Sequence, residues 1–132
     1  MKAFFPYSES TDGVTIRVSV NFLPEQSDVD GQRWFWAYHI RIENDRDSGV
    51  QLLTRHWRIT DARGGLHVVD GEGVIGEQPI IQPGKAHDYV SGCPLNTPSG
   101  SMTGHFIFIG ETAAPFQVEI PEFILAAPTV SQ

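Results

Sequence analysis

The chain lacks several features that would assign it to a class at once. It contains a single cysteine, Cys93, so no disulfide can form within the chain, and this fits a reducing compartment. No segment approaches the ~18 consecutive apolar residues that a membrane helix requires. Residues 1–9 lack the apolar core of a signal peptide and include an early acidic residue. We therefore expect a soluble cytoplasmic protein without a membrane anchor.

Runs of basic residues are also missing. The formal net charge is −7 with histidine neutral, and an acidic surface repels nucleic-acid backbones and anionic lipid. We therefore expect no nucleic-acid partner and no membrane partner. The length of 132 residues, with 40% apolar residues, suits one globular domain over residues 1–132. Within it, residues 126–132 are predicted to form a loosely held C-terminal tail.

Helical periodicity is absent as well. No segment of ten residues without Gly or Pro has apolar residues that recur with a period of 3.6 residues. Apolar residues instead alternate with polar ones, which is the period of a half-buried strand. The segments with this pattern or with short apolar runs are 13–23, 34–43, 50–60, 66–69, 80–81, 86–90, 103–109 and 116–125. Seven or eight short strands predict an all-β fold, an antiparallel sandwich or barrel. The aromatic residues of segment 34–43 favour the sandwich.

Three details qualify this prediction. Arg55 falls on the apolar face of its strand, so either its stem packs and its charged end finds a partner, or the strand bulges. Pro121 interrupts the last strand, which indicates an edge position or a kink. Residues 91–101 contain two prolines and two glycines and are predicted to form a loop.

A glycine motif of the form G-x-G-x-x-G lies at the centre of the chain, at Gly71, Gly73 and Gly76. In dinucleotide-binding folds this motif follows a strand and opens a helix, whose N-terminus holds the pyrophosphate. Here Pro79 and a second Pro-Gly turn follow, so no helix can begin. A glycine-rich turn or a bulged crossing between sheets is the favoured interpretation.

Acidic side chains in the same segment also oppose phosphate: they are Asp70, Glu72 and Glu77. Their spacing matches no EF-hand loop, although a weak divalent-cation site completed by other residues stays open as an alternative. Backbone amides in the segment could still form an anion nest. The predicted ligand contacts, for phosphate, a nucleotide or a cation, are Gly71, Glu72, Gly73 and Gly76.

No pattern in the chain predicts catalysis. The five histidines show no zinc-binding spacing. Cys93 stands alone between Gly92 and Pro94, and such a cysteine is more often a small packed residue than a nucleophile. Neither a G-x-S-x-G elbow nor an H-E-x-x-H helix is present. We therefore predict no catalytic residue, no resident metal and no cofactor.

Several segments taken together resemble the ApaG family. They are residues 34–44, 55–62, 69–79, 89–95 and 97–102. The likeness spans the chain except for its two ends. It implies an immunoglobulin-like or fibronectin type III-like β-sandwich of two antiparallel sheets. The resemblance implies no catalytic residue in this chain.

The resemblance also has implications for function. The ApaG family is linked to cobalt resistance and magnesium efflux, and its genes often neighbour a diadenosine tetraphosphate hydrolase. Similar domains in eukaryotic F-box proteins and in a polymerase-delta-interacting protein look like protein-binding modules. We therefore expect a non-enzymatic module with an unidentified protein partner. Phosphate, nucleotide or divalent-cation binding at the glycine segment is the alternative, and the oligomeric state, a dimer included, is open.

Overall fold

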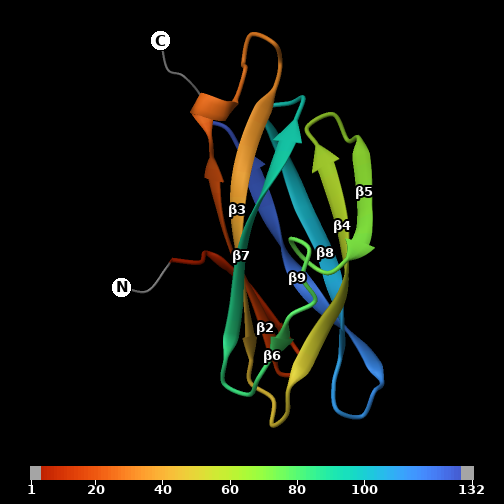
Figure 1. Ribbon diagram of the computed structural model, residues 1–132. Coiled ribbons are helices and arrows are strands. Elements are labelled where there is room, and N and C mark those ends of the chain that lie inside the picture. The colour runs from red at the N-terminus through yellow and green to blue at the C-terminus, as the bar shows by residue number, and fades with distance from the viewer. Residues whose placement is uncertain (1–3, 129–132) are drawn as a thin grey trace.

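A computed structural model of the chain describes residues 4–128, which form a sandwich of two antiparallel β-sheets (Figure 1). The first sheet has the order β1-β2-β3-β7, with bounds Tyr7–Thr11, Val14–Phe22, Trp34–Asn44 and Ala86–Leu95. The second has the order β5-β4-β8-β9, with bounds Leu66–Glu72, Val50–Asp61, Ser99–Ile109 and Pro115–Ala126. The two-residue strand β6 (Ile80–Ile81) pairs with β4, and Pro24–Gln26 forms a 3₁₀ turn. Within residues 4–128, no helix is long and apolar enough to span a membrane.

This architecture confirms the all-β prediction, with nine strands in the described residues where seven or eight were expected. The strand that the sequence did not reveal is β1, whose central residues are polar and exposed. The predicted loop over residues 91–101 is wrong for most of its length, because β7 continues to Leu95 and β8 begins at Ser99. Pro94 is tolerated because β7 is an edge strand, where a missing N–H on the outer side breaks no ladder bond.

The core lies between the sheets and is built from the inward residues of both. In β3 every second residue from Trp36 to Ile42 is buried, as period two requires. Phe123 of β9 is fully buried and joins the two sheets. Its ring lies 5.7 Å from Tyr38, 5.9 Å from Trp57 and 6.0 Å from Tyr7, measured between centroids. Such aromatic contacts add to the large area that each ring buries.

Strand β9 passes through Pro121 without ending. The strand lies at the edge of its sheet, and its register with β8 shifts between Met102 and Gly104. Both features agree with the prediction of an edge position or a kink. Only the first part of the predicted tail, up to Pro128, is described, and residues 129–132 lie outside the described range.

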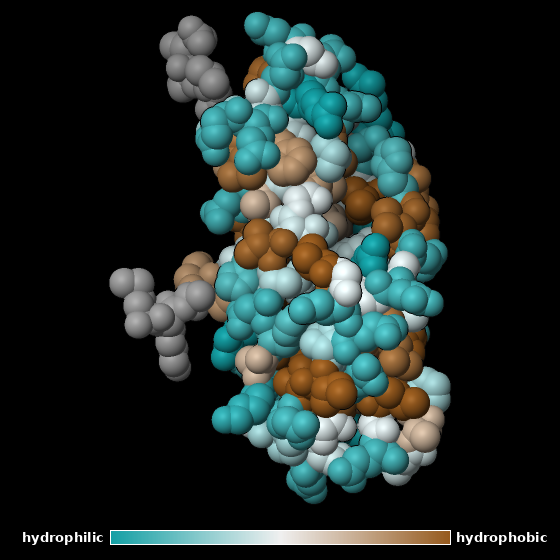
Figure 2. Space-filling model, viewed as in Figure 1, coloured by the Kyte–Doolittle hydropathy of each residue, from teal (hydrophilic) through white to brown (hydrophobic). Residues whose placement is uncertain are grey.

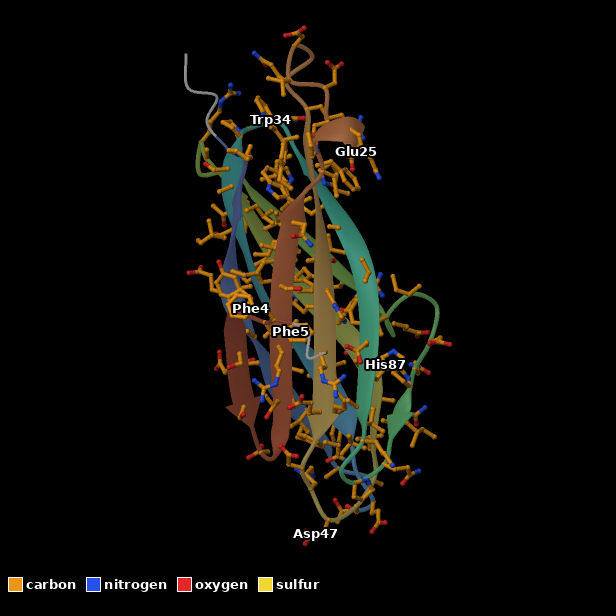
Figure 3. The ribbon with its side chains drawn as sticks, turned by 90° about the vertical axis from the view of Figure 1, so that its left-hand side faces the viewer. Phe4, Phe5, Glu25, Trp34, Asp47 and His87 are labelled. Atoms are coloured by element: carbon orange, nitrogen blue, oxygen red, sulfur yellow. The ribbon has the colours of Figure 1, made fainter. Side chains whose placement is uncertain are left out.

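Ion pairs cover the outer face of the first sheet, which faces the viewer in Figure 3. Glu43 accepts hydrogen bonds from Arg17 and Arg41 at 3.0 Å each, and these bonds hold the pKa of Glu43 below its usual value although burial opposes them. His39 and Asp88 approach to 2.7 Å on the same face. This face is therefore polar.

The two long sides of the sandwich differ. On one side β1 lies against β9, and the amides of Glu119 and Ile124 donate to Thr11 Oγ1 and Tyr7 Oη at 3.2 and 3.3 Å. On the other side the edge strands are β5 and β7, and no hydrogen bond joins them across the sheets in residues 4–128. The sandwich is thus closed along β1 and β9 and open along β5 and β7.

Replacing Phe123 by alanine removes the ring that joins the sheets. Because large-to-small changes of a buried Phe typically cost about 3–5 kcal/mol, we expect a loss of that size in the free energy of unfolding, measured by urea denaturation. The matched control is Ile124→Ala, since the neighbouring Ile124 is half exposed and should lose less than about 1 kcal/mol. Equal losses for the two variants would contradict this account of the core.

Candidate functional site

A cleft of about 740 Å³ opens between the sheets along their unclosed side. It is lined by inward residues of β3, β4, β5 and β7 and by the turn after β5. Its volume is within the range of about 300–1,000 Å³ that is typical of small-molecule sites. Figure 2 looks onto this side and shows apolar side chains gathered over β5.

Arg55 enters this cleft because β4 bulges. The register of β4 with β8 shifts between Leu52 and Thr54, and this shift changes which residues face inward. Leu52 is buried before the bulge and Trp57 after it, so Arg55 shares the inner face with Trp57. Both outcomes expected for Arg55 therefore occur together. The strand bulges, and Arg55 Nη1 donates to the carbonyl oxygens of Glu72 and Gly73, at 2.9 Å each.

The first glycine of the motif makes room for this arginine. Gly71 lies opposite Arg55 in the ladder between β4 and β5. A Cβ atom on Gly71 would lie 2.6–2.7 Å from three atoms of the guanidinium group, which is closer than packed atoms allow. The absence of a side chain at Gly71 therefore lets the guanidinium group lie against the β5 backbone.

The other two glycines shape the turn after β5. The backbone φ angles of Ile75 and Gly76 are +48° and +74°, as in a type I′ turn, and hydrogen bonds of 2.8 and 3.0 Å join Val74 and Glu77 across it. Gly73 has a φ angle of +65°, and a Cβ atom there would overlap the carbonyl oxygen of Glu77. The segment is thus a strand followed by a tight turn, with no helix after it.

The backbone amides of this segment are largely used within the fold. The amide of Gly73 donates to Leu53 at 2.9 Å, and those of Val74 and Glu77 close the turn. Among the predicted contacts, Glu72 and Gly76 line the cleft. Gly71 and Gly73 instead hold Arg55 in place, so the ligand-binding role of these four residues stays a prediction.

Two tyrosines that the sequence did not single out face Arg55 from the first sheet. The hydroxyl of Tyr89 is buried and has no hydrogen-bond partner in the described residues. Burial raises the pKa of Tyr89 well above its usual value and also raises that of Tyr38, while the charge of Arg55 partly offsets both shifts. Both hydroxyls are therefore protonated near neutral pH and can donate hydrogen bonds.

Asp70 and Asp61 are already engaged, whereas Glu72 lines the cleft with an exposed side chain. Asp70 turns to the outer face, where its carboxylate lies 2.6 Å from His56 Nδ1. Asp61 accepts hydrogen bonds from the amides of Gly65 and Arg63, which lower its pKa. No carboxylate lies within 4.0 Å of the Arg55 guanidinium in residues 4–128. Around Arg55 the cleft thus presents the hydroxyl donors of Tyr38 and Tyr89 and no neutralising carboxylate.

The acidic residues and histidines do not assemble into a metal site. His56 and His105 stack with centroids 4.7 Å apart on the outer face of the second sheet. Across the described range 4–128, no three or more His, Cys, Asp or Glu side chains are grouped so that they could hold a metal ion. The acidic residues of the glycine segment are therefore not brought together as one ligand set.

Comparison with known proteins places this sandwich in a family. The family model DUF525, described as the ApaG domain, matches residues 24–110. The chain belongs to the ApaG family. Protein ApaG of Beijerinckia indica is 48% identical over 122 residues, which cover 92% of this chain and 94% of that protein. Protein ApaG of Rhodospirillum centenum is 47% identical with the same coverage.

Solved structures agree with the ApaG assignment. The crystal structure of a Bordetella pertussis protein described as ApaA superposes with a TM-score of 0.85 at 42% identity, covering 95% of this chain and all of that one. The C-terminal domain of wzt superposes with a TM-score of 0.55 at 12% identity, which shows a shared fold only. The names of these relatives state no activity.

The glycine motif yields a ranking of variants by stability. Gly73→Ala should lose about 3 kcal/mol or more of unfolding free energy, because it combines a backbone clash with a positive φ angle. A Cβ atom at Gly76 would meet open space, so Gly76→Ala should lose about 1–2 kcal/mol of unfolding free energy from the positive φ angle alone. Gly71→Ala should lose about 1 kcal/mol, because the flexible Arg55 side chain can move aside. Urea denaturation tests the ranking, and Gly73→Ala as the mildest variant would refute it.

Cys93 provides a test by chemical labelling. Burial raises the pKa of its thiol to about 11, so little reactive thiolate exists near neutral pH. Since an unperturbed thiol has a pKa of about 8.5, we expect a thiol reagent at pH 7.5 to label the native protein at least about a hundredfold more slowly than the urea-unfolded chain. The native rate should rise roughly tenfold per pH unit up to about pH 10. A fast native rate that is flat between pH 6 and 8 would instead indicate an activated thiolate.

Proposed function

We propose that this ApaG-family protein is a non-enzymatic interaction module that binds a protein partner along β5. The observation that carries the proposal is the exposure of this edge strand. Leu66, Val68 and Val69 are 49%, 48% and 39% exposed, and no further strand pairs with β5 in residues 4–128. An uncovered edge with apolar side chains is a template onto which a partner strand can add.

The backbone of β5 supports strand addition at defined positions. The amide of Gly73 donates to the carbonyl oxygen of Leu53, and the amide of Asp61 donates to that of Gly65. In each case the two residues lie directly opposite one another, so these contacts show which opposite pairs are joined by hydrogen bonds. In an antiparallel ladder, hydrogen-bonded pairs alternate with pairs that are not hydrogen-bonded. The backbone groups of the odd-numbered residues of β5 therefore form the hydrogen bonds to β4. The N–H and C=O groups of Val68 therefore point away from β4, toward an incoming strand.

Two further features support a non-enzymatic role. The two closest histidine–aspartate pairs, His39 with Asp88 and His56 with Asp70, lie on the outer faces of the sheets. The pair that lines the cleft, His67 with Asp61, is wider at 3.7 Å. Cys93 is buried, and its thiol is protonated near neutral pH. A link of the partner to cobalt resistance or magnesium efflux is part of the proposal that rests on the family resemblance alone.

The test compares Val68→Lys with Ile124→Lys. The two positions are matched in exposure, at 48% and 49%, but Val68 lies on the open edge and Ile124 on β9, along the closed side. Tagged wild-type and variant proteins should be used to capture partners from cell lysate. We expect Val68→Lys to lose at least about nine-tenths of the captured partner and Ile124→Lys to retain it, because charge on an edge strand opposes pairing.

A second variant tests the mode of binding. Val68→Pro removes the outward N–H group without breaking a bond to β4, so it should abolish capture while the midpoint of thermal unfolding changes little. Equal capture by the wild type and both Val68 variants would exclude β5 as the docking edge. Recovery of nothing above background by the intact wild type would remove the main support for a protein partner.

A further inference from the structure

We propose that the cleft between the sheets binds a small aromatic carboxylate, whose carboxylate group lies between Arg55 and Tyr89. Both groups have hydrogen-bond donors without a partner in residues 4–128. Tyr89 Oη is buried without a partner in the described residues, whereas the great majority of buried hydroxyls have one. Arg55 carries the one cationic side chain on the inner face of the cleft-lining strands, and no carboxylate neutralises it there.

The position of Arg55 suits recognition of an anion. Two carbonyl oxygens hold Nη1, so the side chain is already oriented before a ligand arrives. A guanidinium group has five N–H donors in a planar fork, and no hydrogen bond from Nη2 or Nε is found within residues 4–128. That fork matches the two oxygens of a carboxylate. Tyr38 and Ser91 add hydroxyl groups to the same wall of the cleft.

Part of the remaining wall is apolar and suits a flat hydrocarbon body. Trp57, Val74 and Met102 are buried residues that line the cleft. A ligand body placed against them would lose contact with water, which is favourable for apolar surface. The cleft also has room for a bicyclic ring system.

The charges favour a ligand with a single negative charge over a polyphosphate. Of the two arginines that line the cleft, Arg55 lies on the inner face of β4, whereas Arg33 precedes β3 and is exposed. The amides of Gly73, Val74 and Glu77 are engaged within the fold and add no further anion donors. The net charge of −7 opposes polyanions in addition. The side chains that would hold the carboxylate, those of Arg55 and Tyr89, are not part of the proposed docking contact at Val68, so this inference does not depend on a protein partner.

The direct test uses the intact wild-type protein and two probes that differ in charge. 2-Naphthoate and 2-naphthamide have the same ring system, and only the first carries a carboxylate. Titration calorimetry should give a dissociation constant for 2-naphthoate that is at least about tenfold lower than that for the amide, because charge-assisted hydrogen bonds are the stronger ones. Amide chemical shifts in β4, β5 and β7 should move on titration with the acid.

Variants locate the site. Arg55→Gln should weaken 2-naphthoate binding by about tenfold or more, and Tyr89→Phe by about threefold to tenfold. The matched control is Arg58→Gln, because Arg58 lies on the same strand but is exposed on its outer face; it should leave the affinity unchanged. If Arg55→Gln does not fold, Tyr89→Phe and the comparison of acid with amide decide the question.

Several results would overturn the proposal. Equal affinity for acid and amide, or no saturable binding of the acid at 5 mM, would remove it. If Arg58→Gln lowered the affinity for 2-naphthoate as much as Arg55→Gln does, the binding would be non-specific charge attraction. Tighter binding of 2-naphthyl phosphate than of 2-naphthoate would assign the cleft to phosphate esters and contradict the carboxylate assignment.

Discussion

The placement of one charged side chain between two β-sheets constrains much of this molecule. A guanidinium group that is partly removed from water needs acceptors for the N–H groups that it turns toward the protein, and it needs space for its planar end. Arg55 obtains the acceptors from the carbonyl groups of Glu72 and Gly73, and Gly71 leaves the space. The bulge in β4 turns Arg55 inward in the first place. The glycine motif is therefore explained by the packing of the arginine and by the turn that follows, and neither requires a bound nucleotide.

The same arrangement explains why one side of the sandwich is open. Along β1 and β9, hydrogen bonds between the sheets and the packing of Phe123 close the structure. Along β5 and β7, the space between the sheets is a cleft that Arg55 and two tyrosines help to line. An interior lined with donors cannot close as tightly as an apolar one, because buried polar groups need partners. The exposed edge of β5 and the cleft beside it are both consequences of this open side.

Much of the fold could be predicted from sequence because its signals are local. Alternation of apolar and polar residues identified the strands around Trp36 and Trp57, and Pro121 marked an edge strand. Strand β1 could not be identified in this way, because it carries almost no apolar pattern and is held by its pairing with β2. The cleft was missed for a related reason. Residues 91–95 contain Gly and Pro and were predicted to be a loop, which hid the inward alternation of Tyr89, Ser91 and Cys93.

The most direct test of this account is the position of the Arg55 side chain in solution. Nuclear Overhauser contacts should be measured on protein labelled with ¹³C and ¹⁵N, from the Arg55 Hε and Hδ protons. We expect contacts to the α-protons of Gly71, because the guanidinium group lies against the β5 backbone. The absence of any contact between Arg55 and Gly71 would show that the guanidinium group lies in solvent away from β5, and it would contradict this placement.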